Sequence, residues 1–306
     1  MTQTRTVLIA RHFGGPEVLE FHTEQAPAPG PGEVLVQVRA AGINPIDARR
    51  MTGEFGSNLP HSFGTEFAGT IQALGAGTAP WQVGDAVLGS GAGFTHATHI
   101  VVPAENLVAK PEAMSWETAG SLAGAGRTAT AILRELAVPA TGSLLIHGGS
   151  GGVGSITVQL AVRQGVTVVA TASAANQDYL RGLGAIPVEY GPGLADRIAA
   201  VHPAPFTASI DMIGNSEATE ASLALVEPEG AIATIAGRPV DSPRVQAIWV
   251  KRNPDDLRQL VDDVVDGTYR WEVSRSYPLL DAVTAYRDIL SGHTRGKSVL
   301  TVPPQL

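Results

Sequence analysis

Short apolar stretches, separated by glycine-rich turns, dominate the chain up to about residue 120. Residues 33–39 alternate between aliphatic and polar side chains, which predicts a strand with one buried face. Further short strands are predicted over residues 67–74, 84–88 and 99–102. Many short strands with turn signals between them are typical of a compact, barrel-like β domain.

Beyond residue 120 the pattern changes to apolar strands that alternate with helical periodicity. Residues 143–147 form a short apolar run, and apolar side chains then recur at helical spacing over residues 153–161. Residues 167–171 predict the next buried strand, and a helix follows through residues 179–184. Two more strands are predicted, over residues 209–211 and 231–236. This alternation indicates βαβ units and a parallel sheet that is covered on both faces.

The C-terminal part returns to a mixed pattern, with an amphipathic helix predicted over residues 279–290 and a last strand over residues 298–302. That strand would return to the first domain and make it discontinuous in the sequence. The predicted domains are therefore residues 1–121 with 264–306, and residues 122–263. These patterns predict an α/β protein in which a barrel-like β domain accompanies a doubly wound parallel sheet.

The composition narrows the functional classes. The 306 residues suit about two domains, and 21 basic against 29 acidic residues give a formal charge of −8. Nucleic-acid binding needs a basic face, so we expect no nucleic-acid partner. The chain has no cysteine, which excludes disulfides and thiolate-ligated zinc or iron–sulfur centres. The apolar run at residues 7–10 is too short for a signal peptide or a membrane helix, so we expect a cytoplasmic protein without a membrane partner.

A glycine-rich turn follows the strand predicted at residues 143–147. It fits the pattern G-x-G-x-x-G and opens a predicted helix, the context in which this pattern marks a dinucleotide site. Its residues are Gly149, Ser150, Gly151, Gly152, Val153 and Gly154. Small residues let the backbone approach a pyrophosphate, and the helix N-terminus supplies N–H donors and a partial positive charge. The alternative is a turn that merely joins strand to helix.

The end of the following strand bears on the choice between NADPH and NADH. NAD-binding folds usually place an acidic residue there to hold the ribose diol, but residues 171–176 contain no carboxylate. Ser173 and Asn176 can donate hydrogen bonds to a 2′-phosphate, so the sequence predicts NADPH as the cofactor. The nearest basic residue in the sequence is Arg181, which lies outside residues 171–176. Residues 171–176 themselves therefore offer the phosphate no charge-assisted hydrogen bond.

An ordered set of motifs resembles one enzyme superfamily. The segments are AAGINPID (40–47), GTEFAG (64–69), VGDAV (83–87), the glycine-rich turn, LGA (183–185) and GHTRGK (292–297). They resemble the medium-chain dehydrogenases/reductases, and within them the zinc-free quinone oxidoreductase (zeta-crystallin-like) branch. The resemblance implies a GroES-like β-barrel catalytic domain, a Rossmann domain and an NADPH site in the cleft between them.

The resemblance also bears on zinc. Zinc-dependent relatives carry Cys where Asn44 stands and His where Thr65 stands, so both ligands are missing here. A catalytic zinc needs three well-placed ligands, and we predict no metal. The chain has one close set of histidines: His61, His96 and His99. Glu66 aligns with an acid that supports the metal site in zinc relatives, and here we expect it to form structural hydrogen bonds.

The resemblance places three residues in the catalytic machinery: Asn44, Asp47 and Thr128. Asn44 would sit at the mouth of the nicotinamide pocket and donate to the substrate carbonyl or to the ribose. Asp47 would organise a proton relay or pair with Arg49 or Arg50, and Thr128 would contact the nicotinamide. The alternatives are local structural roles: a turn residue for Asn44, a turn or cap carboxylate for Asp47 and an N-terminal helix position for Thr128.

Further residues would bind the cofactor by their positions in the motifs. Tyr190 would lie near the adenosine phosphate or, alternatively, pack as an aromatic at a strand end. Lys297 would either reach the cofactor or lie on the surface. Ile213, Ile235 and Ala236 would line the cofactor from the carboxyl ends of later strands, where ligands of parallel sheets bind.

A metal-free site of this kind suits hydride transfer from NADPH to a quinone or an α,β-unsaturated carbonyl. The developing phenolate or enolate oxygen then needs hydrogen-bond donors. The tyrosine that relatives often use as a proton donor is not evident in residues 93–99, where His96, His99 or solvent could act instead. Two alternatives stay open: an enoyl reductase acting on a thioester or a natural-product intermediate, and an NADPH-binding protein without catalysis.

The resemblance implies homodimers or tetramers, with dimers paired through edge strands of the Rossmann domain. Residues 244–251 (RVQAIWVK) have the composition of such an edge, and equally that of an ordinary buried strand. The predicted partners are thus a small-molecule acceptor and a second copy of the chain.

Overall fold

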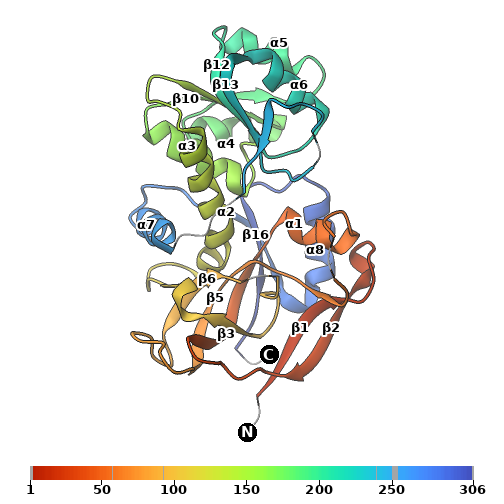
Figure 1. Ribbon diagram of the computed structural model, residues 1–306, viewed down its shortest axis with the longest axis vertical. Coiled ribbons are helices and arrows are strands. Elements are labelled where there is room, and N and C mark those ends of the chain that lie inside the picture. The colour runs from red at the N-terminus through yellow and green to blue at the C-terminus, as the bar shows by residue number, and fades with distance from the viewer. Residues whose placement is uncertain (1–2, 57, 92, 239, 250–253, 305–306) are drawn as a thin grey trace. The chain divides into compact units, whose positions relative to one another are not determined.

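Two sets of strands with different pairing patterns organise the chain (Figure 1). The computed structural model describes residues 3–56, 58–91, 93–238, 240–249 and 254–304. The chain divides into two units, one made of Met1–Gly124 with Asn253–Leu306 and the other of Ala125–Arg252. The first unit is mostly antiparallel β-structure, and the second is a parallel sheet with helices.

The first unit contains a seven-stranded and a three-stranded sheet. The larger sheet has the order β15-β16-β3-β5-β6-β8, with β7 paired to β3, and the smaller sheet has the order β2-β1-β4. The strands are β1 (Thr4–Ala10), β2 (Leu19–Gln25), β3 (Glu33–Ile43), β4 (His61–Ser62), β5 (Glu66–Leu74), β6 (Ala86–Ser90), β7 (His99–Pro103), β8 (Leu107–Ala109), β15 (Val273–Pro278) and β16 (Lys297–Thr301). The helices are α1 (Pro45–Thr52), α7 (Pro254–Val265), α8 (Ala282–Leu290) and the first part of α2 (Trp116–Leu136).

The predicted strand at residues 33–39 forms the first part of β3, the central strand of the larger sheet. Its valines Val34, Val36 and Val38 are fully buried, as the alternation predicts for the core-facing positions. They pack in one core with Phe67 of β5, which pairs with β3 along most of its length. The strands predicted over residues 67–74, 84–88 and 99–102 correspond to β5, β6 and β7.

The last strand, β16, joins the first unit from the far end of the sequence. It pairs antiparallel with β3, and Ser298 lies opposite Ile43. This pairing places Lys297, the first residue of β16, beside the end of β3 and next to Asn44. The domain boundaries predicted at residues 121/122 and 263/264 stay a prediction.

The second unit is a six-stranded sheet with the order β11-β10-β9-β12-β13-β14, and all of its strands are parallel. The chain moves outward in one direction from β9 and in the other direction from β12. Ligands of such sheets bind where the order reverses, at the carboxyl ends of the strands. The strands are β9 (Ser143–His147), β10 (Thr167–Ala172), β11 (Ile186–Glu189), β12 (Phe206–Asp211), β13 (Val226–Thr234) and β14 (Val245–Ala247).

Helices cover both faces of this sheet, as Figure 1 shows for α3 and α4 against α5 and α6. Leu144 of β9 packs with Ile132 of α2 and Val158 of α3 in one core. The next residue, Leu145, packs in a separate core with Ile198 of α5. The predicted α/β class with a doubly wound sheet is therefore confirmed. The helices are α3 (Gly152–Arg163), α4 (Gln177–Gly182), α5 (Leu194–Val201) and α6 (Ser216–Leu225), together with the second part of α2.

β14 is the outermost strand of the parallel sheet and falls within the predicted edge at residues 244–251. Residues 250 and 251 lie outside the described part of the chain. Pairing of two copies through this edge stays a prediction.

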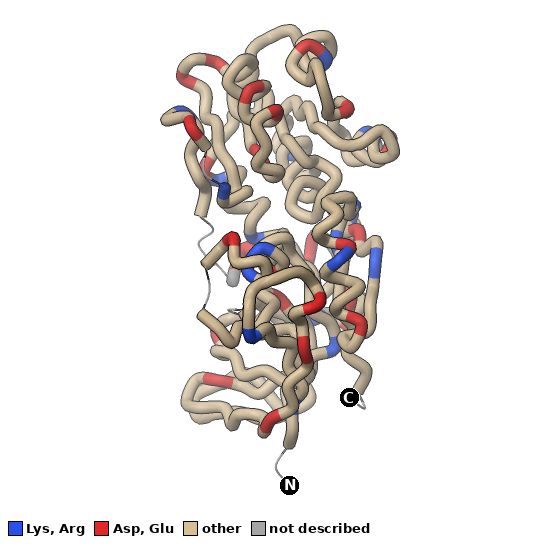
Figure 2. The backbone as a smooth tube through the Cα atoms, turned by 90° about the vertical axis from the view of Figure 1, so that its right-hand side faces the viewer, with Lys and Arg blue, Asp and Glu red and all other residues tan. Residues whose placement is uncertain are grey.

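Charged residues of both signs are scattered along the described chain (Figure 2). None of the helices in the described chain is long and apolar enough to cross a membrane.

A buried histidine at the end of β9 predicts a pH dependence of stability. Burial lowers the pKa of His147 to about 4, whereas the unfolded chain takes up this proton near pH 6.5. The stability that this group contributes is therefore complete above about pH 6.5 and is lost as the pH falls toward 4.

We expect the free energy of unfolding to fall by about 2 kcal/mol more in the wild type than in His147→Gln between about pH 7.5 and pH 5. Glutamine keeps a hydrogen-bonding group near Ser222, whose hydroxyl lies 3.1 Å from His147 Nε2, but it does not titrate. Urea denaturation at the two pH values measures the difference. Equal losses in both proteins would contradict the prediction.

Candidate functional site

A buried ion pair lies at the centre of the first unit. Glu66, the first residue of β5, has no exposed surface, and Lys297 is 4% exposed. The Lys297 ammonium lies 2.7 Å from Glu66 Oε1. Lysine and glutamate are rarely this buried unless they are paired, so the pair accounts for the burial of both.

The Lys297 ammonium has three acceptors, which match its three N–H groups. Besides Glu66, it donates to Asn44 Oδ1 at 2.6 Å and to the carbonyl oxygen of Ile43 at 3.2 Å. Lys297 therefore does not lie on the surface, and each of its three N–H groups has an acceptor. Its predicted contact with the cofactor stays a prediction, and it would require one of these bonds to be given up.

The Asn44 amide is fixed from both ends. Its oxygen accepts from Lys297, and its Nδ2 group donates to Glu66 Oε1 at 2.9 Å and to Thr65 Oγ1 at 3.3 Å. Both hydrogens of the amide are therefore used within the unit. In this conformation Asn44 has no spare donor for a substrate carbonyl or a ribose. Its predicted contact with either group stays a prediction.

Two glycines make room for the Glu66 carboxylate. A Cβ on Gly42 would lie 2.3 Å from Glu66 Oε1, so a larger residue there would displace the carboxylate. On the other side, the backbone N–H of Gly124 in α2 donates to Glu66 Oε2 at 2.6 Å. The carboxylate is thus held by an ammonium, an amide and a backbone N–H, which satisfies a buried charge.

Asp47 connects the segments that carry Asn44 and Thr65. It is fully buried in the first turn of α1, and it accepts hydrogen bonds from the backbone N–H of Asn44 at 3.0 Å and of Gly64 at 3.1 Å. Asn44 precedes the helix and Pro45 begins it, a common start for a helix. The geometry gives Asp47 a positioning role, and its predicted part in a proton relay stays a prediction.

The donor set at this centre does not fit zinc. The side chains that meet there are an amide, a hydroxyl, a carboxylate and an ammonium that already lies 2.6 Å from the amide oxygen. Zinc in proteins takes thiolate, imidazole and carboxylate ligands, and a second cation beside the ammonium would be repelled. Within the described chain, no group of three or more His, Cys, Asp or Glu residues could hold a metal ion.

The two histidines considered as proton donors are part of the packing. His96 is fully buried, and its Nε2 lies 3.1 Å from the carbonyl oxygen of Gly42, so Nε2 carries the hydrogen and Nδ1 accepts from the Tyr286 hydroxyl at 2.9 Å. Burial lowers the pKa of His96 and of His99. Because His96 is enclosed and both of its ring nitrogens have hydrogen-bond partners, it does not suit the role of proton donor.

In the second unit the glycine-rich turn follows β9 as predicted. Gly148 has φ +82°, and a Cβ on Gly154 would lie 2.2 Å from the Gly148 carbonyl oxygen, so the turn and α3 pack at a distance that only glycine allows. A Cβ on Gly151, by contrast, would make only an ordinary contact, at 3.5 Å from the Gly148 carbonyl oxygen. The first N–H groups of α3 have no acceptor within the helix, so they are available to an anion.

Ser150, Ser173 and Asn176 come together at the ends of β9 and β10. Asn176 Nδ2 donates to Ser173 Oγ at 3.2 Å and to Ser150 Oγ at 3.4 Å. The nearby Arg181 pairs with Asp178 on the exposed side of α4. The structure thus joins three predicted cofactor residues into one polar cluster without a carboxylate.

Apart from Thr128, the remaining predicted cofactor residues of this unit lie near carboxyl ends of strands. Ile213 is half exposed after β12, and Ile235 and Ala236 follow β13. Tyr190 follows β11, and its backbone N–H donates to Ala172. Thr128 lies inside α2, which begins at Trp116, so it does not occupy an N-terminal helix position. Cofactor contacts by these residues stay predictions.

Asp211, the last residue of β12, is a polar residue at this edge of the sheet that the sequence did not predict for the site. Its Oδ1 accepts from the backbone N–H of Ile213 at 2.7 Å and of Gly214 at 3.0 Å, which fixes the loop that follows the strand. Burial raises the pKa of this carboxyl group. An aspartate that ends an apolar strand is the sequence signal for such a residue.

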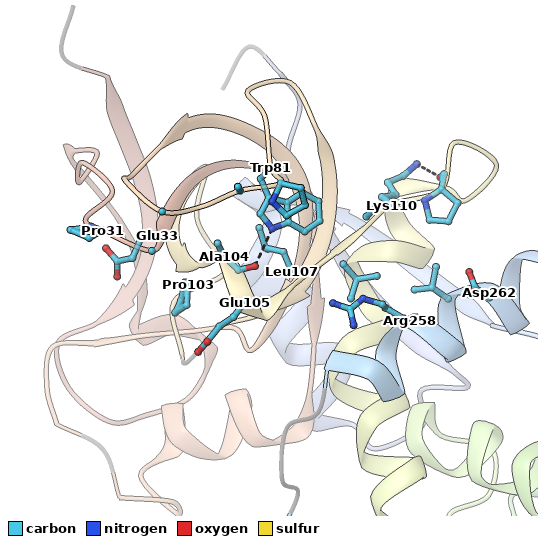
Figure 3. A pocket seen from close by; sticks show the side chains of 18 residues that line it. Pro31, Glu33, Trp81, Pro103, Ala104, Glu105, Leu107, Lys110, Arg258 and Asp262 are labelled. Atoms are coloured by element: carbon cyan, nitrogen blue, oxygen red, sulfur yellow. Dashed lines mark hydrogen bonds between the residues drawn. The ribbon is translucent and has the colours of Figure 1, made fainter.

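The first unit also has a cavity of about 1000 Å³ (Figure 3). Trp81, Lys110 and Arg258 are among its lining residues, and the indole N–H of Trp81 donates to the carbonyl oxygen of Ala104. None of the residues around the buried ion pair lines this cavity. We place the candidate site at the ion pair because that is where polar groups converge.

Comparison with known proteins identifies the family to which the chain is similar. Residues 30–112 match the family model described as alcohol dehydrogenase GroES-like domain, and residues 190–300 match the model described as zinc-binding dehydrogenase. A quinone oxidoreductase of Pseudomonas aeruginosa is 29% identical over 94% of this chain and 97% of its own length. The pikromycin polyketide synthase component PikAII of Streptomyces venezuelae is 32% identical over 92% of this chain, which spans 8% of that relative.

Solved structures show the same fold. The quinone oxidoreductase from Coxiella burnetii is 29% identical with a TM-score of 0.90, covering 98% of this chain and 100% of the other. The Escherichia coli quinone oxidoreductase complexed with NADPH is 25% identical with a TM-score of 0.88, covering 97% and 99%. The chain belongs to the medium-chain dehydrogenase/reductase superfamily. Within it, the chain falls in the quinone oxidoreductase branch, which confirms the resemblance and the predicted GroES-like domain.

The buried ion pair predicts a large cost when one partner is removed. Lys297→Met leaves the Glu66 carboxylate buried without its counter-charge, so we expect the free energy of unfolding to fall by about 3–5 kcal/mol. Arg258→Met is the control, because it breaks the exposed pair with Asp255, which is worth less than about 1 kcal/mol.

Chemical denaturation measures both variants. Adding Glu66→Gln to Lys297→Met removes the uncompensated charge and should recover a large part of the loss. A Lys297→Met protein no less stable than Arg258→Met would show that the pair is not a structural requirement.

Proposed function

We propose that the protein is a zinc-independent oxidoreductase that transfers a hydride from NADPH to a quinone or an α,β-unsaturated carbonyl. The glycine-rich turn carries this proposal, since it opens α3 at the carboxyl end of β9, where the strand order of the parallel sheet reverses. A pyrophosphate suits this position because helix N–H groups and glycine backbone meet there. The NADPH complex of the Escherichia coli relative supports the same cofactor.

The cluster of Ser150, Ser173 and Asn176 supports NADPH over NADH. Its hydroxyl and amide groups can donate to a 2′-phosphate, and no carboxylate lies in the cluster to repel one. The second unit would therefore bind the dinucleotide, with Ile213, Ile235, Ala236, Tyr190 and Thr128 as further proposed contacts.

The metal-free polar centre of the first unit restricts the acceptor. An alcohol or simple aldehyde needs strong polarisation of its oxygen, which a metal supplies by Lewis-acid chemistry. A quinone or an enone spreads the incoming charge over a conjugated system and needs only hydrogen-bond donors. When bound, NADPH supplies the hydride, and the chain binds, orients and polarises the acceptor.

NADPH oxidation with a panel of acceptors tests the proposal. We expect turnover with 1,4-benzoquinone or a simple enone, and no change in rate after treatment with EDTA, because the set of side chains at the centre does not fit zinc. Tight NADPH binding without turnover on any acceptor would favour a non-catalytic binding protein instead. Loss of activity with EDTA that zinc restores would overturn the metal-free mechanism.

An enoyl reductase acting on acyl thioesters is the second candidate function. The similarity to a polyketide synthase component, at 32% identity over most of this chain, favours it. The electronic requirement is the same, because an α,β-unsaturated thioester also forms an enolate. Turnover of an enoyl thioester such as crotonyl-N-acetylcysteamine, without turnover of quinones, would select this function.

Asn176 provides a test of the cofactor assignment. Asn176→Asp removes a donor and adds a negative charge near the proposed 2′-phosphate, so we expect the Kd for NADPH to rise about tenfold or more relative to that for NADH. Thr167→Asp adds the same charge at the opposite end of β10 and serves as the control. Titration calorimetry measures both cofactors, and an unchanged preference in Asn176→Asp would place the phosphate elsewhere.

A further inference from the structure

Thr65 has an unused donor beside the buried ion pair. It lies directly before β5 and is half-buried, whereas its neighbour Glu66 is fully enclosed. In the part of the chain that the structure describes, its hydroxyl accepts one hydrogen bond, from Asn44 Nδ2 at 3.3 Å, and donates none. A hydroxyl has one O–H donor and two acceptor positions, so the donor remains for a ligand.

The Thr65 hydroxyl is the end of a hydrogen-bond chain that starts at a fixed positive charge. The Lys297 ammonium donates to Asn44 Oδ1, and the Asn44 amide donates in turn to Thr65 Oγ1. Each bond in such a chain polarises the next one when it lies in a low-dielectric interior. The ammonium itself is enclosed and fully bonded, so its charge can act on a ligand through this chain.

The backbone holds the chain in register. The Asp47 carboxylate accepts from the N–H of Asn44 and of Gly64, and this fixes the separation of Asn44 and Thr65. Gly64 has φ +94°, and a Cβ there would lie 2.3 Å from Thr95 Oγ1, so the turn before Thr65 requires glycine. A group held this firmly is preorganised, as a donor to a developing charge must be.

We infer that Thr65 is a catalytic hydrogen-bond donor to the acceptor oxygen, with Asn44 and Lys297 as positioning residues that polarise its hydroxyl. This inference rests on the proposed function and names a residue outside the predicted site. The ligand class is a conjugated carbonyl whose oxygen becomes an anion, either a quinone or an α,β-unsaturated ketone or thioester.

The step balances as a hydride transfer. When bound, NADPH would supply the hydride with its electron pair from C4 of its nicotinamide to the acceptor and would leave as NADP⁺. A pair of electrons moves to the acceptor oxygen, which becomes an enolate or a phenolate and takes a hydrogen bond from the Thr65 O–H. Water then supplies the proton that completes the reduced product, and Thr65 keeps its own proton throughout.

Two variants at position 65 test the inference through turnover. Thr65→Val keeps the shape and removes the hydroxyl, so we expect kcat to fall about 10- to 100-fold, with NADPH binding unchanged. Thr65→Ser keeps the hydroxyl and should retain most of the activity. If Thr65→Val turned over as fast as the wild type, the inference would be overturned while the proposed function stood.

A binding measurement separates the inference from the proposed function. 4-Nitrophenolate is a phenolate that needs no turnover, and its absorbance reports binding. We expect Thr65→Val to weaken its binding about tenfold and Thr65→Ser to restore it. If the wild-type protein bound the phenolate through Thr65 but oxidised no NADPH, only the proposed function would be overturned. If wild type and Thr65→Val bound the phenolate equally well, the inference would be overturned.

A double-mutant cycle tests the positioning role of Asn44. In the wild-type background, Asn44→Leu should lower kcat, because the Thr65 hydroxyl loses its polarising partner. In the Thr65→Val background the same change should cause little further loss of kcat. Equal fold losses in both backgrounds would mean that Asn44 does not act through Thr65, which would overturn its assigned role.

Discussion

The ion pair between Lys297 and Glu66 is the constraint on which the first unit depends. Two opposite charges are almost fully removed from water, and the desolvation of both must be offset by their attraction and by further hydrogen bonds. The offset requires Asn44, the Gly124 N–H and the Ile43 carbonyl in fixed places. The strands that carry these groups are therefore held in one register, since a slip of one residue would turn one charged side chain to the other face of the sheet and leave its buried partner unpaired.

The pair also joins parts of the chain that are distant in sequence. Glu66 begins β5 and Lys297 begins β16, which pair with β3 from opposite sides. β16 reaches this position only after the chain has passed through the whole parallel sheet of the second unit. The ion pair therefore needs a residue from the last strand of the chain. The candidate site of the first unit is complete only when this C-terminal strand has paired with β3.

Alternation of apolar and polar positions predicted the central strand β3, and short apolar runs between turn signals predicted others such as β9 and β10, because both patterns are local to the strand. Strands such as β1, β2, β11 and β15 were not predicted. Helix α2 shows where local reasoning fails. Its 21 residues include Gly120 and Gly124, which disfavour a helix. The reason lies in tertiary structure: a Cβ on Gly120 would lie 2.6 Å from the Ala40 carbonyl oxygen, and Gly124 must expose its N–H to Glu66. Neither requirement is visible in the helix's own sequence.

The candidate site also has one part that the sequence predicts and one part that it does not. The glycine-rich turn could be predicted because its residues are contiguous and their chemistry resides in the backbone. The polar centre could not, because Asn44, Glu66 and Lys297 each have an ordinary local interpretation, and their meaning comes from contacts across 22 to 253 residues of sequence. Those contacts define a fixed and enclosed positive charge. A metal binds the substrate oxygen directly, whereas this ammonium is enclosed and can act only through hydrogen bonds. In the function we propose, such a centre would polarise the acceptor more weakly than a metal, which would suit acceptors that delocalise the incoming charge themselves.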